Sequence, residues 1–387
     1  MGGRQTTASH AFRIAGLCAV VAALCLSLGG CRLGYIMHAA MGQAELLCGS
    51  ESLAKVEAQG VLDEKQIQRA RLIQEVKKFA EHELGLKKTD NYSTLYPKPL
   101  KNPIWNISAA PKDRLKPVTW WFPIVGNLPY LGYFDHDKAE AEKLKLEKEG
   151  NDVVLRSVAA YSTLGWFSDP ITMNMLDWQP AWLAQVVIHE LTHATLYVKG
   201  QSAFNEGLAQ FIGVEGAVLF LTRTRGADDA QARLAAGVAH DERIFSHFLA
   251  GLFSQLETLY NSSVSYDDKL VRREEIYDLE VARFQVMEEQ FQTNHFNNFG
   301  SYPINNALLI SYGMYHRNFD LFRQVYEYKD RDIKKMLDFF IQLSKENHPD
   351  LLEATRSWLK EQSEERRARR AIRMFGWNKD GMVYNGQ

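Results

Sequence analysis

The chain has 387 residues, of which 46% are hydrophobic and 24% are charged. This is an ordinary globular composition, and the length suits one large domain or two smaller ones. The formal net charge is only −2. Such a balance lacks the strongly basic character of nucleic-acid-binding proteins, so we expect no nucleic-acid partner.

Residues 1–30 have the pattern of a secretory signal peptide. Arg4 and Arg13 give a positively charged start, and an apolar run follows from residue 14 to residue 30. Residues 28–31 read LGGC and resemble the lipobox of bacterial lipoproteins. The resemblance implies cleavage before Cys31 and acylation of that cysteine, for example by palmitate, which anchors the chain in the lipid bilayer. The alternative is a transmembrane anchor, for which the run is a little short.

The residues around this cysteine also predict the location of the protein in the cell. Arg32 follows Cys31, whereas lipoproteins kept in the inner membrane carry an Asp there, so the resemblance implies the outer membrane. Cys48 is the only other cysteine after cleavage, and with Cys31 acylated no disulfide forms within the chain. We expect a lipid-anchored domain of the bacterial cell envelope that faces the periplasm.

Residues 31–117 form the first predicted region. Apolar residues recur at three- and four-residue intervals from residue 34 to residue 86, which predicts helices. Residues 88–117 contain five prolines and predict an irregular wrap over the surface.

Residues 118–225 form the predicted catalytic core. Two strands are expected, over residues 118–126 and 152–165, with a charged helix over residues 137–150 between them. Pro180 suits the first turn of a helix that ends near Gly200. Ser202 is expected to cap a second helix, which runs toward Phe220.

Residues 226–387 form the third predicted region and are helical throughout, although the whole of 31–387 could be one compact unit. The mixed charge run EERRARRAIR at residues 364–373 indicates either a solvated helix face or a contact with anionic lipid. The predicted fold class is therefore mainly α with a small β-sheet (α+β).

The candidate chemistry lies in the first of the two core helices. His189, Glu190 and His193 form the pattern H-E-x-x-H. On a helix the two histidines project from one face and can reach one metal ion. Glu190 lies about 100° around the helix, where it can touch a water on that metal without binding it. The alternative is a buried amphipathic helix whose histidines hydrogen-bond to neighbours.

A catalytic zinc ion needs three protein ligands and an open position for water. Glu206, thirteen residues after His193, and Glu215 both lie on the second core helix. They are nine residues, or two and a half turns, apart and point to opposite sides, so only one faces the metal. Helix geometry alone does not choose between them.

The expected mechanism is hydrolysis by water activated on one zinc ion, with Glu190 as general base. A donor must then stabilise the oxyanion of the tetrahedral intermediate. Tyr315 and Tyr161 are candidates, and His316 and His295 are further ones. Each could equally be a core residue with a satisfied polar group.

With these residues in place, the chain resembles a family of bacterial lipoproteins named as predicted aminopeptidases, which is gluzincin-like. The resemblance covers nearly all of the chain after Cys31. It rests on stretches such as LGYIMHAAMGQAELL, WWFPIVGNLPYLGYF, HELTHATLYVKGQSAFNEGLAQFIG and NNALLISYGMY. It implies a zincin-like fold and a peptide substrate. Gluzincins use the N-E-x-x-A pattern for the third ligand, which favours Glu206 over Glu215.

The resemblance implies a metallopeptidase more strongly than an aminopeptidase. The G-x-M-E-N motif that zinc aminopeptidases use for the substrate amine is missing. Glu215 or Asp169 could take over this role, and residues 152–165 could be the edge strand that pairs with the substrate backbone. An envelope endopeptidase of the same fold and a non-catalytic scaffold with a structural metal are the alternatives.

Overall fold

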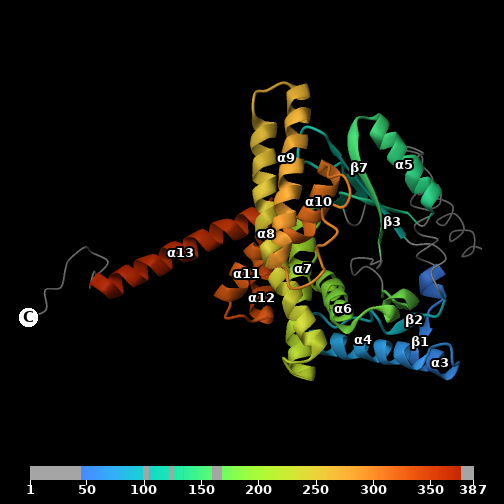
Figure 1. Cartoon of the computed structure of the whole chain (residues 1–387). Coiled ribbons are helices and arrows are strands. Elements are labelled where there is room, and N and C mark those ends of the chain that lie inside the picture. The colour runs from blue at the N-terminus through green and yellow to red at the C-terminus, as the bar shows by residue number, and fades with distance from the viewer. Residues whose placement is uncertain (1–44, 99–103, 123–125, 134, 159–167, 376–387) are drawn as a thin grey trace, which may run out of the picture.

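The computed structural model describes residues 45–98, 104–122, 126–133, 135–158 and 168–375 (Figure 1). The described chain is mainly helical with small sheets, which confirms the α+β prediction. The predicted signal peptide, Cys31 and Tyr161 lie outside these residues. The division into three regions stays a prediction.

The main sheet has three antiparallel strands in the order β6-β3-β7. Its strands are β3 (Ile104–Pro111), β6 (Leu131–Tyr133) and β7 (Asn151–Val158). Helix α5 (His136–Lys148) and helix α10 (Asn306–His316) both pack against it (Figure 1). β7 has one strand neighbour within the described residues and is therefore an edge of this sheet.

Alternate residues of β3 face these two helices. Ile107 and Ala109 cluster with Ala139 of α5, whereas Ala110 clusters with Ile310 of α10. Because successive side chains of a strand point to opposite faces, β3 is covered on both sides.

Our prediction of an irregular wrap over residues 88–117 was wrong for this strand. Pro111 is the last residue of β3, so this proline ends the strand and does not interrupt it. The same range also contains a second, shorter strand over residues 94–96. The helical prediction for residues 34–86 needs a smaller correction. A short strand, β1 (Glu51–Ser52), precedes α3 (Leu53–Ala58) and α4 (Glu64–His82), and residues 34–44 are not described.

The remaining strands are short. β1 pairs with β2, and β2 pairs with β8, while β4 and β5 form a hairpin. Their bounds are β2 (Thr94–Tyr96), β4 (Trp120–Phe122), β5 (Gly126–Leu128) and β8 (Ile171–Thr172). The expected strand over 118–126 is thus two strands, and the one over 152–165 is β7, with residues 159–165 not described.

The chain after Pro180 is almost entirely helical, as predicted. The helices are α6 (Pro180–Thr195), α7 (Ser202–Arg225), α8 (Ala230–Asn261), α9 (Tyr266–Met287), α10 (Asn306–His316), α11 (Phe319–Tyr328), α12 (Ile333–Lys345) and α13 (Leu351–Phe375). Two single 3₁₀ turns, η1 (Met173–Asp177) and η2 (Glu288–Gln290), complete the set. α8 and α9 form a long hairpin, and α13 projects away from the body (Figure 1).

Helices α6 and α7 form the centre of the largest hydrophobic cluster, together with α4 and α11. In the ranges described above, no helix combines the length and the apolar character that crossing a membrane requires.

The two central helices approach closely at Gly213 of α7. A Cβ atom there would lie 2.8 Å from the backbone oxygen of Gln185 and 3.2 Å from Cβ of His189, both on α6. Neither atom belongs to a flexible side-chain end, so the helices would have to separate. The absence of a side chain at Gly213 therefore fixes the position of α7 relative to His189.

Replacing Gly213 by Ala is expected to lower the free energy of unfolding by about 1–3 kcal/mol, because overpacking displaces a helix. The matched control is Gly251→Ala in α8, where an added Cβ meets no atom within 4 Å. That change should raise stability by about 0.5–1 kcal/mol, because alanine favours the helix. Denaturant unfolding of the two variants checks both signs. Equal effects in both would contradict the close-approach argument.

Candidate metal centre

Helix α6 carries the H-E-x-x-H motif near its C-terminal end. Pro180 is its first residue, as expected, but the helix ends at Thr195 rather than near Gly200. Four apolar residues anchor its buried face: Ala184, Val187, Ile188 and Leu191. This packing fixes the positions of the histidines, since a helix with a buried face cannot rotate freely about its axis.

Asn205 closes the turn between the two core helices. Its Oδ1 accepts a hydrogen bond from the Val198 amide at 2.9 Å, and its Nδ2 donates to the Val198 carbonyl at 2.8 Å. Our expectation that Ser202 caps α7 was wrong, because Ser202 is the first helical residue and Gln201 precedes it without a side-chain cap. The amide of Asn205 holds the turn instead, one residue before Glu206.

Three candidate ligand atoms converge between α6 and α7. Oε2 of Glu206 lies 3.4 Å from Nε2 of His189 and 3.3 Å from Nε2 of His193. The two Nε2 atoms are 3.2 Å apart. All three residues are buried, and they form a group that could hold a metal ion. The described structure thus brings together the three predicted ligands, and it places Glu206 rather than Glu215 beside the histidines.

The charges in this group stabilise one another. Burial alone would raise the pKa of Glu206, but His193 and His189 lower that pKa well below its usual range. Burial alone would lower the pKa of His193, whereas Glu206 and Glu190 raise it. A buried carboxylate needs such compensation from nearby positive charge.

The residues fit a bound cation. The two Nε2 atoms and the Glu206 oxygen point to one place, and two imidazoles with one carboxylate are a known catalytic zinc set. Oε2 of Glu190 is buried and has no hydrogen-bond partner among the described residues. Since an unpartnered buried carboxylate oxygen is costly, this atom is suited to a donor that enters the site with the ligand.

Three tyrosines surround the centre. The ring of Tyr315 stacks on His189 with centroids 6.1 Å apart, and burial and the charges of Glu206 and Glu190 raise its pKa well above the usual value. Burial and Glu206 raise the pKa of Tyr197 to about 12. Burial and Glu206 likewise raise the pKa of Tyr130. All three hydroxyls are therefore protonated donors at neutral pH.

Tyr130 and Tyr197 were missed by the sequence analysis. Tyr197 follows His193 by four residues, which is a spacing that could have flagged it. Tyr130 lies in the NLPYLGYF stretch after β5 and comes to the site only through the fold.

The other two histidine candidates belong to a second buried cluster. His316 Nδ1 lies 2.8 Å from Oε2 of Glu242, and His295 Nε2 lies 3.4 Å from its Oε1. Gln210 donates to the same carboxylate at 2.6 Å. Burial alone would raise the pKa of Glu242, but His316 and His295 lower it to about 2. The cluster links α7, α8 and α10 one turn beyond Glu206.

The two candidate acids for the substrate amine lie apart. Asp169 is buried and its backbone oxygen accepts from the Tyr92 amide at 2.7 Å. After burial, the negative charges of Glu190 and Asp169 raise the pKa of Tyr92, so both carboxylates lie near that side chain. Glu215 interacts instead with Arg331, Glu327 and Arg323, away from the histidines.

Glu215 has a distinct titration behaviour. Burial raises its pKa from 4.5 to about 7. Between these values the folded protein keeps a proton that the unfolded chain loses, so wild-type stability falls as pH rises from about 4.5 to about 7. Glu215→Gln removes this loss. The variant should be more stable than wild type by about 1–3 kcal/mol at pH 8, with little difference at pH 4.

Urea unfolding at both pH values measures this difference, and metal analysis of the same variant should show unchanged metal content. Glu206→Gln is the control that should lose metal. A stability gain for the Glu215 variant that does not depend on pH would contradict the raised pKa of Glu215.

Comparison with known families now adds an independent observation. A family model described as Putative aminopeptidase matches residues 34–354, which is most of the chain and includes every residue of the metal centre. Searches of curated proteins and of solved structures each found no significant match. The chain belongs to the Putative aminopeptidase family.

Proposed function

We propose that this protein is a zinc-dependent peptidase, and more specifically an aminopeptidase. The observation that carries the proposal is the convergence of His189, His193 and Glu206, whose ligand atoms all lie within 4.8 Å of one another. The family description supports peptide-bond hydrolysis. The donor set favours Zn²⁺, although other divalent ions compete for imidazole and carboxylate ligands. We propose that the surrounding fold is of the zincin type.

Each residue of the centre has a proposed task. His189, His193 and Glu206 would hold the ion. A bound Zn²⁺ supplies Lewis acidity, which lowers the pKa of water and polarises a carbonyl. Glu190 would accept the proton of the attacking water and deliver it to the leaving amine. Its buried Oε2 supports this role, because that oxygen has no competing hydrogen bond within the part of the chain that the structure describes.

Tyr315 is the proposed donor to the developing oxyanion. Its ring stacks on a ligand histidine, and its raised pKa keeps the hydroxyl proton available. Tyr130 and Tyr197 lie near enough to Glu206 for its negative charge to raise the pKa of both hydroxyls. Tyr161 keeps the same proposed role but lies outside the described residues. A preorganised hydroxyl is effective here because the site is buried.

The substrate would bind along β7. This strand is an edge of the described sheet, so an extended peptide can add to it by backbone hydrogen bonds. Asp169 is the proposed acid for the free amine, because it is buried and because its charge and that of Glu190 both act on Tyr92. A free-amine requirement would separate an aminopeptidase from the endopeptidase alternative.

Glu190→Gln is the direct test of catalysis. The variant should bind zinc as wild type does, because Glu190 is not a ligand, while kcat falls by about 10²–10⁴-fold through loss of the general base. Metal analysis and hydrolysis of blocked and unblocked peptides, before and after chelation, measure both effects. Unchanged activity together with unchanged zinc content would contradict the role of Glu190 as general base, whereas a zinc-loaded wild type without peptidase activity would leave the scaffold alternative.

We also propose that Cys31 is the acylated N-terminus of the mature protein, anchored in the outer membrane and facing the periplasm. The family match begins at residue 34, so residues 1–33 lie outside the shared sequence. This boundary suits a removable signal peptide followed by a lipid anchor.

Cys31→Ser should abolish incorporation of labelled palmitate into the protein, since the only acylated thiol is removed. Cys48→Ser is the matched control and should be labelled like wild type, because Cys48 is an exposed free cysteine within the domain. Labelling of the Cys31 variant, or loss of label in the Cys48 variant, would refute the anchor.

A further inference from the structure

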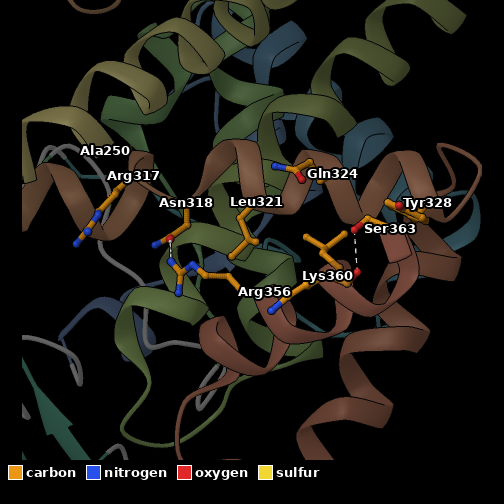
Figure 2. A pocket seen from close by; sticks show the side chains of 10 residues that line it. Ala250, Arg317, Asn318, Leu321, Gln324, Tyr328, Arg356, Lys360 and Ser363 are labelled. Atoms are coloured by element: carbon orange, nitrogen blue, oxygen red, sulfur yellow. Dashed lines mark hydrogen bonds between the residues drawn. The ribbon is translucent and has the colours of Figure 1, made fainter. Parts of the chain in front are cut away.

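A positively charged pocket lies between α11 and α13, on the helical side of the molecule (Figure 2). Its volume is about 620 Å³, within the range of small-molecule and short-peptide sites. Three cations line it, Arg317, Arg356 and Lys360, and its described lining contains no acidic residue.

The cations are only partly neutralised by their neighbours. Arg356 donates to Oδ1 of Asn318 at 2.9 Å, and its contact with Glu353 is long, at 3.5 Å, and exposed (Figure 2). Lys360 is exposed and has no ion pair among the described residues. Exposed ion pairs contribute little, so Arg356 and Lys360 keep most of their attraction for an anion.

Arg317 is the third cation, and its orientation is fixed. Its guanidinium lies 4.3 Å from the ring centroid of Phe253, and its Nη2 is 3.0 Å from Oε1 of Glu257. A guanidinium packed on an aromatic face loses little side-chain freedom when it binds an additional acceptor.

A second pocket adjoins this one and is lined by residues that are close in sequence to residues of the metal centre. It has a volume of about 680 Å³ and shares Arg317, Asn318 and Arg356 with the first. Its other lining includes Ser202, which lies one turn before Glu206 on α7, and Pro129, the neighbour of Tyr130.

Two acids, Asp350 and Glu353, line the second pocket. Asp350 accepts hydrogen bonds from the amides of Leu352 and Glu353 and so caps the start of α13. The two pockets together therefore run from residues close in sequence to the metal centre to the three cations. The cation pocket has no acid among its described lining residues, and the glutamates that contact Arg317 and Arg356 lie outside that lining.

We propose that this cation pocket, formed by Arg317, Arg356 and Lys360, binds the C-terminal carboxylate of a short peptide substrate. The proposal rests on the peptidase function above and deepens it by naming the substrate class. Guanidinium groups match the two oxygens of a carboxylate in geometry and charge. A fixed distance between this pocket and the metal centre would limit the length of peptide that engages both.

The test measures peptide binding to the full chain carrying Glu190→Gln, so that no turnover is needed. The probes are peptides of one sequence and increasing length, each with either a C-terminal carboxylate or a C-terminal amide. The acid form should bind about tenfold more tightly at one preferred length, because charge-assisted hydrogen bonds form only with the carboxylate.

Two variants and one matched control test whether the preference for the carboxylate form arises at the cation pocket. Lys360→Gln and Arg356→Lys should each reduce the tenfold preference to about threefold or less. Arg367→Gln removes a positive charge from the same helix, at an exposed position that does not line the pocket, and should leave the preference unchanged.

Equal binding of acid and amide peptides would overturn the proposal, as would a preference that persists in both pocket variants. Tight binding of an amidated peptide that ends in Glu would overturn the assignment to the terminal carboxylate. Peptide hydrolysis by the wild type is measured separately. If the wild type hydrolyses peptides but the binding assay shows no carboxylate preference, only the assignment of the cation pocket fails. If the preference is present but the wild type hydrolyses no peptide, the proposed peptidase function fails.

Discussion

The site depends on a buried carboxylate placed against two buried imidazoles across the contact between α6 and α7. Glu206 lies 3.3–3.4 Å from both histidine nitrogens, and all three residues are largely shielded from water. Such a group is costly to bury unless positive charge compensates the carboxylate. The helices must therefore meet closely and in one register, and the packing at Gly213 and the Asn205 bridge to Val198 provide both conditions.

The rest of the fold supports this contact with buried polar links. Glu242 joins α8 to Gln210 on α7 and to His316 on α10, which keeps α10 and its Tyr315 beside His189. On the other side, Asp152 of β7 pairs with Arg273 of α9 at 2.7 Å and accepts from the backbone amide of Asn306 at 3.0 Å. Satisfied buried networks of this kind rigidify the elements that they join. The sheet edge at which a substrate would bind is thus fixed relative to the metal centre.

Sequence reasoning succeeded where periodicity and spacing were strong. The helices after Pro180 follow from their apolar pattern, and the convergence of His189 and His193 follows from their four-residue spacing. It failed at β3, because prolines are common both in loops and at strand ends, and only pairing with β6 and β7 shows which applies. It also misjudged the end of α6, since the turn is closed by a side-chain amide from the following helix rather than by a local cap.

By itself, the sequence determined that two imidazoles project from one face of a helix, with the carboxyl group of Glu190 about 100° around that helix. It also determined that the chain is mainly helical and that acids suitable as a third ligand lie on the next helix. Local periodicity and spacing are sufficient for each of these conclusions, because each depends on residues that are close together in the sequence. The family resemblance favoured Glu206 over Glu215, but helix geometry did not, and the tertiary structure places Glu206 beside the histidines. Only the tertiary structure decided that His316 contacts Glu242 and that Tyr130 lies near Glu206. These depend on how far apart the helices pack and how each is rotated about its axis, and both are set by contacts between residues distant in sequence.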